Sequence, residues 1–264
     1  MTKGFFPKKD EMTDNERELL QDEAIVLHVR HWQTADKYVV CFTKKYGKLR
    51  FIAYGARYVK NVQGRLLQPF ACVNIEVQQG QKIDKLRSCE LVRLPQAFDM
   101  QQMAYGAVAA ELTAVLTEDR EPQEELYALL KETLATLTKR NPRLVVLSFA
   151  IKLLGLTGFA PQLSHCVGCG RKLEEKDEAW FSPLQGGALC ADCRAAYAGE
   201  GLEPCGGGTR RLWQWLEQLD FAKPAPFAVR GGDLMALERL LYKFIFFQTD
   251  KQLNSLNFLN QMRL

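Results

Sequence analysis

The chain has 264 residues with a net charge of +4, and its 47% hydrophobic and 25% charged residues are values typical of folded globular proteins, which excludes wholesale disorder. No apolar run reaches the roughly 18 to 20 residues of a membrane helix, and the N-terminus lacks the apolar core of a secretion signal, so we expect a cytoplasmic protein without a membrane partner. The eight cysteines should then be reduced, and paired cysteines indicate metal ligands before disulfides.

Residues 1–23 lack apolar periodicity and carry 7 acids against 4 cations, which predicts a flexible leader. From residue 24 to residue 94 the pattern changes to short β-branched and aromatic runs separated by turn residues. Five strands are expected, at residues 24–30, 37–43, 48–54, 70–79 and 86–94. Five short strands avoid open edges by closing into a barrel, and the number fits the oligonucleotide-binding (OB) fold. We therefore predict an OB-fold DNA-binding domain over residues 24–94.

The same block holds the excess positive charge, because residues 24–93 carry 13 Lys and Arg against 4 Asp and Glu, a net of +9. Gly47 is expected to turn a hairpin, after which strand alternation places Lys48 and Arg50 on a charged outer face. A solvated β-surface is the alternative, but so large an excess favours phosphate binding. The predicted DNA contacts are Lys44, Lys45, Lys48, Arg50, Arg57, Lys60 and Arg65. Tyr46, Tyr54 and Tyr58 lie among them and can stack on bases, whereas His28, His31 and Trp32 are interpreted as packing residues.

After residue 95 the apolar spacing becomes helical, with stripes over residues 108–116 and 126–137. Asn141 and Pro142 predict the start of a helix that is apolar nearly all round and therefore buried. Helical spacing returns at residues 212–219 and 233–247. We predict an α+β protein in which a helical domain, residues 95–161 and 200–264, carries an inserted zinc-binding segment at residues 162–199.

The strongest motif consists of two C-x-x-C pairs, which have the spacing of a structural tetrahedral zinc site. The predicted ligands are Cys166, Cys169, Cys190 and Cys193. A catalytic zinc keeps a position for water, whereas four thiolates close the shell, so we predict a structural Zn²⁺ that holds two strands and a helix together. Three alternatives are that His165 or Cys205 replaces one cysteine, that the pairs are redox-active, or that the site has lost its metal. Cys41, Cys72 and Cys89 stand alone on strands and are expected in the core.

The order of these features resembles the RecO family of bacterial recombination-mediator proteins over nearly the full chain. Within the barrel the similarity is carried by residues 46–49 (YGKL), 53–57 (AYGAR) and 67–70 (LQPF). Further on it is carried by residues 153–161 (LLGLTGFAP), which lead into Cys166, and by residues 253–259 (LNSLNFL). Tyr54 stands where members of the family often have a basic residue.

The resemblance implies binding of single- and double-stranded DNA, annealing of complementary strands, and work with the RecR protein. It also implies docking of the acidic C-terminal tail of single-strand-binding protein on the helical region, and through these partners the loading of RecA on gapped DNA in the nucleoid. For the tail pocket we suggest Arg140 and Arg143, which flank the apolar helix.

Two other classes of function are considered. A zinc-dependent nucleic-acid-processing enzyme is disfavoured, because none of the three histidines lies in an H-x-E pattern and no Walker loop or G-x-S-x-G elbow is present. A zinc-containing scaffold or transcription factor that binds mainly proteins remains an alternative, and binding to a random single strand of DNA distinguishes it. We therefore expect a non-enzymatic protein without catalytic residues.

Overall fold

A computed structural model describes residues 18–94, 97–223 and 229–261. The chain divides into two compact units, residues 1–97 with 117–131 and residues 98–116 with 132–264. Residues 1–17 of the expected leader lie outside the described residues. No helix among the described residues is long and apolar enough to cross a membrane.

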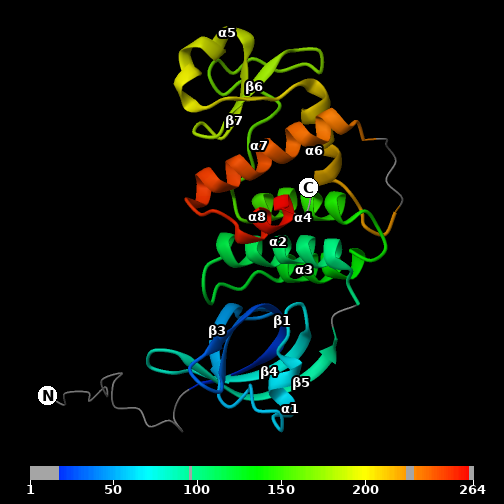
Figure 1. The fold of residues 1–264 in the computed structure, drawn as a ribbon. Coiled ribbons are helices and arrows are strands. Elements are labelled where there is room, and N and C mark those ends of the chain that lie inside the picture. Colours follow the sequence, from blue (N-terminus) through cyan, green and yellow to red (C-terminus); the bar gives the residue numbers. More distant parts are fainter. Residues whose placement is uncertain (1–17, 95–96, 224–228, 262–264) are drawn as a thin grey trace, which may run out of the picture. The chain divides into compact units, whose positions relative to one another are not determined.

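The first unit is a closed barrel with the strand order β1-β2-β3-β5-β4. Its strands are β1 (Leu19–Trp32), β2 (Asp36–Thr43), β3 (Gly47–Ala53), β4 (Cys72–Gln78) and β5 (Asp84–Arg93), and helix α1 (Val62–Leu66) connects β3 to β4 (Figure 1). All neighbouring pairs are antiparallel except β3 and β5, whose short parallel contact closes the barrel. The fold class predicted from the sequence is confirmed, and the strand order is that of the OB fold.

Strand β1 is long because it serves two neighbours. Its first half pairs with β4, and its second half pairs with β2. A bulge between Val26 and His28 interrupts the pairing of β1 with β2. Ala24 and Val26 point into the barrel before the bulge and Val29 packs against the same core after it. The bulge therefore turns Arg30 and Trp32 outward, because the alternation of side chains shifts by one residue.

The predicted leader ends too late, since β1 begins at Leu19 and not after residue 23. Leu20 is buried in the barrel, while the charged residues between it and Ala24 hide the strand pattern. Glu23 is stabilised there by a residue distant in sequence, because Lys131 contacts its carboxylate at 2.6 Å. Contacts of this kind allow acidic residues to occupy a strand.

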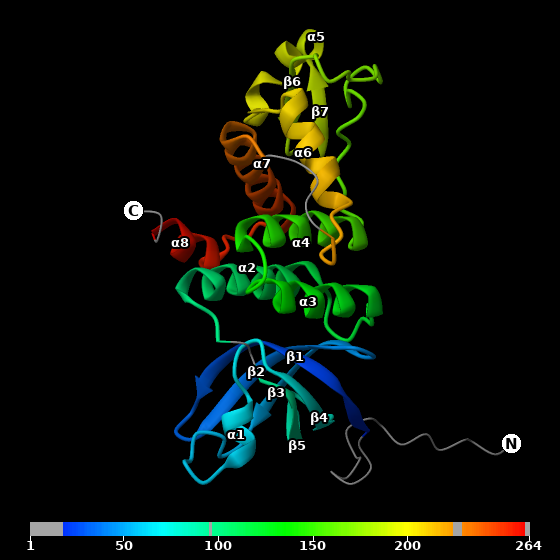
Figure 2. The same ribbon diagram turned by 90° about the vertical axis from the view of Figure 1, so that its right-hand side faces the viewer.

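The second unit is helical (Figure 2). It contains α2 (Met100–Leu116), α4 (Pro142–Leu156), α6 (Gly207–Glu217), α7 (Gly231–Thr249) and α8 (Asn254–Gln261), and α3 (Glu124–Thr136) belongs to it from residue 132 onward. The side-chain oxygen of Asn141 accepts from the N–H groups of Arg143 and Leu144, as expected for the N-cap of α4. Helix α4 is buried over most of its length, which confirms the prediction from its apolar surface.

A small lobe is attached to this helical unit. It contains β6 (Ala179–Ser182), β7 (Gly187–Cys190), the short helix α5 (Ala191–Arg194), the 3₁₀ segment η2 (Ala195–Glu200) and β8 (Glu203–Pro204). The strands form one sheet in the order β7-β6-β8. The lobe packs on α6 and α7, as Figures 1 and 2 show. It extends beyond the predicted segment 162–199, because β8 pairs with β6.

Candidate nucleic-acid interface and metal centre

Residues 117–131 pack with the barrel, although the sequence predicts them in the helical domain. The N–H of Arg120 donates to the carbonyl oxygen of Lys48 at 2.9 Å, so this segment runs alongside β3. Gly47 turns the hairpin with φ +63°, as predicted, and a Cβ there would lie 1.9 Å from the carbonyl oxygen of Glu121. The close approach requires glycine at this position.

Three of the seven predicted DNA contacts are paired with acids of this segment. Lys44 contacts Glu124 at 2.9 Å, and Arg50 contacts Asp119 at 3.1 Å. Lys48 contacts Asp119 at 3.3 Å and also donates to the carbonyl oxygen of Thr117 at 2.5 Å. The outer face of β3 is therefore largely neutralised within the barrel unit.

The prediction that Lys48 lies on an exposed face is wrong. The residue is 3% exposed, and burial lowers the pKa of its ammonium group, although Asp119 opposes this shift. Ile52 on the same side of β3 is also buried. Strand alternation predicts the outer side correctly but cannot reveal that a distant segment covers it. Lys48 is consequently a structural cation.

A second group of predicted cations is exposed and unopposed. Arg57, Lys60 and Arg65 lie in the loop after β3 and in α1, and none has a carboxylate partner among the described residues. Arg57 holds this loop against the β1–β2 turn, since its backbone N–H donates to Ala35 and its side chain to Thr34, both at 2.9 Å. Lys45 is exposed as well, at the β2–β3 turn.

Aromatic and aliphatic side chains are interleaved with these cations. Tyr54 and Tyr58 are 54% and 65% exposed, and Val59 is 87% exposed. Tyr46 differs, because it is partly buried against the barrel core. Exposed tyrosines beside unpaired cations are the residue types that bind unpaired bases and their phosphates.

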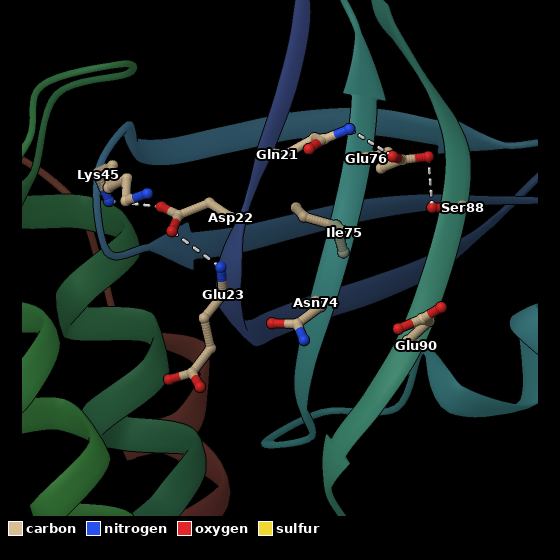
Figure 3. Close-up of a pocket in the computed structure, with 9 residues that line it drawn as sticks. All are labelled: Gln21, Asp22, Glu23, Lys45, Asn74, Ile75, Glu76, Ser88 and Glu90. Carbon is tan, nitrogen blue, oxygen red and sulfur yellow. Dashed lines mark hydrogen bonds between the residues drawn. The ribbon is translucent and has the colours of Figure 1, made fainter.

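The opposite charge occupies another part of the barrel. A cavity of about 380 Å³ opens on the outer side of β1, β4 and β5, and Figure 3 shows the side chains around it. Its lining includes Asp22, Glu23, Glu76 and Glu90, with Lys45 at its edge. Glu76 accepts from Gln21 and Ser88, so the polar groups largely satisfy one another. An acidic surface repels phosphate, which leaves the loop after β3 as the favoured side for nucleic acid.

The four predicted zinc ligands form one cluster. The sulfur atoms of Cys166, Cys169, Cys190 and Cys193 all lie within 4.8 Å of one another. Neither alternative ligand belongs to the cluster: His165 is exposed and its ring contacts Ser164, and Cys205 is buried elsewhere. Gly168 packs closely against the cluster, because a Cβ there would lie 3.1 Å from the sulfur of Cys193.

Backbone amides support negative charge at this cluster. Burial acts to raise the pKa of Cys166, but N–H groups of Cys190, Cys169 and Gly168 outweigh it and lower that pKa to about 6. The N–H of Cys190 lies 3.3 Å from the Cys166 sulfur. Four thiolates this close repel one another unless a cation joins them, so the donor set fits a metal ion with a closed tetrahedral shell.

The single cysteines are core residues, as predicted. Cys41, Cys72 and Cys89 are buried in the barrel unit, and burial raises the pKa of each thiol, that of Cys89 to about 11. Thiols of this kind are unreactive.

The cysteine lobe is firmly attached to the helices of its own unit. The side chain of Arg210 on α6 donates to the carbonyl oxygens of Cys205 at 3.1 Å and Glu174 at 2.5 Å. Phe181 and Phe244 meet edge to face at 5.3 Å between ring centroids. Glu203 pairs with Lys243 of α7 at 2.7 Å. The lobe is thus built as a supporting element of the helical unit.

The suggested tail pocket requires a correction. Arg143 donates through Nε and Nη2 to both carboxylate oxygens of Glu238, at 2.9 and 2.5 Å. Glu238 is 5% exposed, so this pair is fixed between α4 and α7 and does not offer a free cation. Arg140 is half-buried, and its side chain has no carboxylate partner among the described residues.

One cation–aromatic group on the barrel is not evident from the sequence. The guanidinium carbon of Arg30 lies 4.2 Å from the ring centroid of Tyr38 and 5.4 Å from that of Trp32. The two rings are 5.8 Å apart with 33° between their planes. Packing is the role expected for Trp32, but neither it nor Tyr38 belongs to the barrel core. The bulge in β1 turns these side chains outward, and it can be recognised only from the pairing of β1 with β2.

These features define the class of protein: an OB-type barrel joined to a helical unit, with a lobe whose four clustered cysteines could hold a metal ion. The models of two families match the chain, "Recombination protein O N terminal" over residues 17–95 and "Recombination protein O C terminal" over residues 97–257. The chain belongs to the RecO family of DNA repair proteins.

Three relatives named DNA repair protein RecO match along almost their whole length. The protein of Symbiobacterium thermophilum is 32% identical over 246 residues, which cover 91% of this chain and 96% of the relative. That of Moorella thermoacetica is 27% identical over 246 residues, covering 92% and 91%. That of Desulforamulus reducens is 28% identical over 242 residues, covering 91% and 93%. The resemblance stated from the motifs is confirmed.

Proposed function

We propose that this protein is a non-enzymatic DNA-binding protein of recombinational repair that binds single- and double-stranded DNA and anneals complementary strands. The observation that carries the proposal is the unopposed cation group Arg57, Lys60 and Arg65 beside exposed tyrosines on an OB-type barrel. When Lys and Arg side chains bind phosphate groups, they replace the counterions of the DNA. The electrostatic repulsion between two strands is therefore lower when both strands are bound to such a surface. Family membership supports the role in DNA repair.

The proposed DNA contacts are fewer than the seven expected from the sequence. Arg57, Lys60 and Arg65 remain as primary contacts, since their side chains are exposed and have no carboxylate partner among the described residues. Lys45 is exposed as well, but its backbone N–H donates to the carboxylate of Asp22 beside the acidic cavity, so we keep its side chain as a further contact. Lys44 and Arg50 are half-exposed and paired, so their contribution is secondary. Phosphate binding at those two positions first requires an existing ion pair to open.

The partners that we propose are those implied by membership of the RecO family. With RecR, the protein helps to load RecA onto DNA covered by single-strand-binding protein, in the cytoplasm and on the nucleoid. The acidic tail of single-strand-binding protein docks on the helical unit, where Arg140 is the cation we retain, because Arg143 is already paired with Glu238. A structural Zn²⁺ held by the four cysteines keeps the small lobe folded.

The decisive experiment is strand annealing in the presence of single-strand-binding protein. Complementary oligonucleotides coated with that protein should anneal when this protein is added, without nucleotide hydrolysis or strand cleavage. The triple variant Arg57→Ala/Lys60→Ala/Arg65→Ala should lose annealing, while a control that neutralises three exposed cations of the helical unit should keep it. Metal-dependent turnover of DNA by the purified protein would instead establish an enzyme.

A further inference from the structure

The Arg30–Trp32–Tyr38 group is a cation–aromatic platform on the outside of the barrel. Arg30 and Tyr38 are directly opposite in the β1–β2 ladder, and Trp32 follows on the same side. Arg30 is exposed and has no carboxylate partner among the described residues. A guanidinium group that lies over two aromatic rings and has no carboxylate partner is suited to bind a flat, polar ligand that carries a negative charge.

The platform lies at the same end of the barrel as the proposed phosphate contacts. The β1–β2 turn follows Trp32 directly, and Arg57 is bound to the carbonyl oxygens of Thr34 and Ala35 in that turn. The N–H of Gly55 donates to the carboxylate of Asp36, the ladder partner of Trp32, at 2.8 Å. These bonds bring Arg57 and the start of its loop next to the aromatic platform.

We propose that Trp32, Tyr38 and Arg30 form a stacking subsite for an unpaired nucleobase, and that this subsite makes the protein bind single strands more tightly than duplex. The proposal rests on the DNA-binding function proposed above and names the ligand of one part of that surface. In a duplex both faces of each base are covered by neighbouring pairs, whereas a single strand can present a base to the rings. The cations of the neighbouring loop bind the phosphates of either form.

The expected effect is selective for single strands. Removing one stacked aromatic should weaken single-strand binding about 5- to 150-fold, because such a contact contributes about 1–3 kcal/mol. Duplex affinity should change by less than about twofold, since phosphate contacts dominate there.

The experiment uses the full chain and measures the anisotropy of a labelled oligothymidylate and of a duplex of equal length at one salt concentration. Trp32→Leu is compared with Trp32→Phe, because the first keeps an apolar strand residue and the second restores a ring. The Trp32→Leu variant should lose affinity for single strands, and the Trp32→Phe variant should keep most of it. The matched control is Trp215→Leu, which removes a similar Arg–Trp stack from α6, where Arg211 lies 4.9 Å from the ring centroid.

The chain has four tryptophans, and a stacked thymine quenches tryptophan emission, so the quenching by oligothymidylate should disappear in Trp32→Phe and persist in Trp215→Leu. Equal losses for both DNA forms, no loss in Trp32→Leu, or equal binding by the leucine and phenylalanine variants would each overturn the stacking subsite. Failure of the proposed function is distinguishable: the Arg57/Lys60/Arg65 triple variant would then bind both forms like the parent protein.

Discussion

Replacing Lys48 by methionine should destabilise the barrel while affecting DNA binding less than the loss of an exposed lysine does. Methionine keeps most of the buried stem but removes the charged hydrogen bond to the carbonyl oxygen of Thr117, 2.5 Å away. A hydrogen bond to a charged group contributes about 1.5–3 kcal/mol. Removing one partner of a buried ion pair destabilises a protein more strongly when it leaves the other charge buried without a partner. This larger loss of stability does not apply here, because Asp119 is 49% exposed and still pairs with Arg50. We therefore expect a loss of about 2 kcal/mol.

Amide exchange measured by mass spectrometry resolves this loss locally, which matters because the chain has two units. Peptides of β3 should exchange about 30-fold faster, since 1.36 kcal/mol corresponds to a factor of ten. The control Lys45→Met removes the same charge from an exposed position and should weaken DNA binding without faster exchange. If Lys48→Met left exchange unchanged and weakened DNA binding more than Lys45→Met, the assignment of Lys48 as a structural cation would be refuted.

Three further predictions concern the metal, the salt dependence and the pH dependence. Cys166→Ser should lower metal content and the thermal stability of the helical unit while the affinity for DNA stays the same, measured by atomic emission, calorimetry and anisotropy; lost DNA binding in a folded variant would place the lobe in the interface. The Arg57/Lys60/Arg65→Ala variant should reduce the slope of log K against log salt by about 2 to 3, as three lost phosphate contacts require, and an unchanged slope would contradict these contacts. Burial acts to raise the pKa of Glu23, but hydrogen bonds from Lys131 and Tyr127 lower it overall. The stability contributed by this lowered pKa is present above the pKa of Glu23 in the unfolded chain and is lost as the pH falls through the folded value; Glu23→Gln should flatten that acid limb in unfolding experiments, and an unaltered limb would argue against the pairing.

The parts of the fold that sequence alone predicts are those with local causes. Asn141 and Pro142 act within one helical turn, and each C-x-x-C pair positions its two sulfur atoms through a single tight turn. The start of α4 and the clustering of the four cysteines are therefore both found where the sequence predicts them. Lys48 could not be assigned in this way, because its partners Thr117 and Asp119 are about 70 residues further along the chain. A cation in a strand looks exposed until the covering segment is known.

Register sets the second limit. Before the bulge in β1 the core side chains are Ala24 and Val26, and unbroken alternation would point Trp32 inward as well. The actual pairing of β1 with β2 turns that ring outward beside Tyr38 and Arg30. Bulges depend on how two strands fit together, so neither composition nor spacing within β1 indicates one.

The distribution of charge, not its total, decides where nucleic acid can bind to the barrel unit. Residues 24–93 alone have a net of +9, but residues 18–23 add three acids, and residues 117–131 add five acids and two cations, which leaves +3 for the described part of the unit. Among the added acids, Asp119 pairs with the cations of β3, and Asp22 and Glu23 line the cavity on β1, β4 and β5. None of these acids pairs with a cation of the loop after β3 among the described residues, so the positive potential of that loop is not reduced. It therefore attracts phosphate groups to the end of the barrel where the exposed aromatic rings lie.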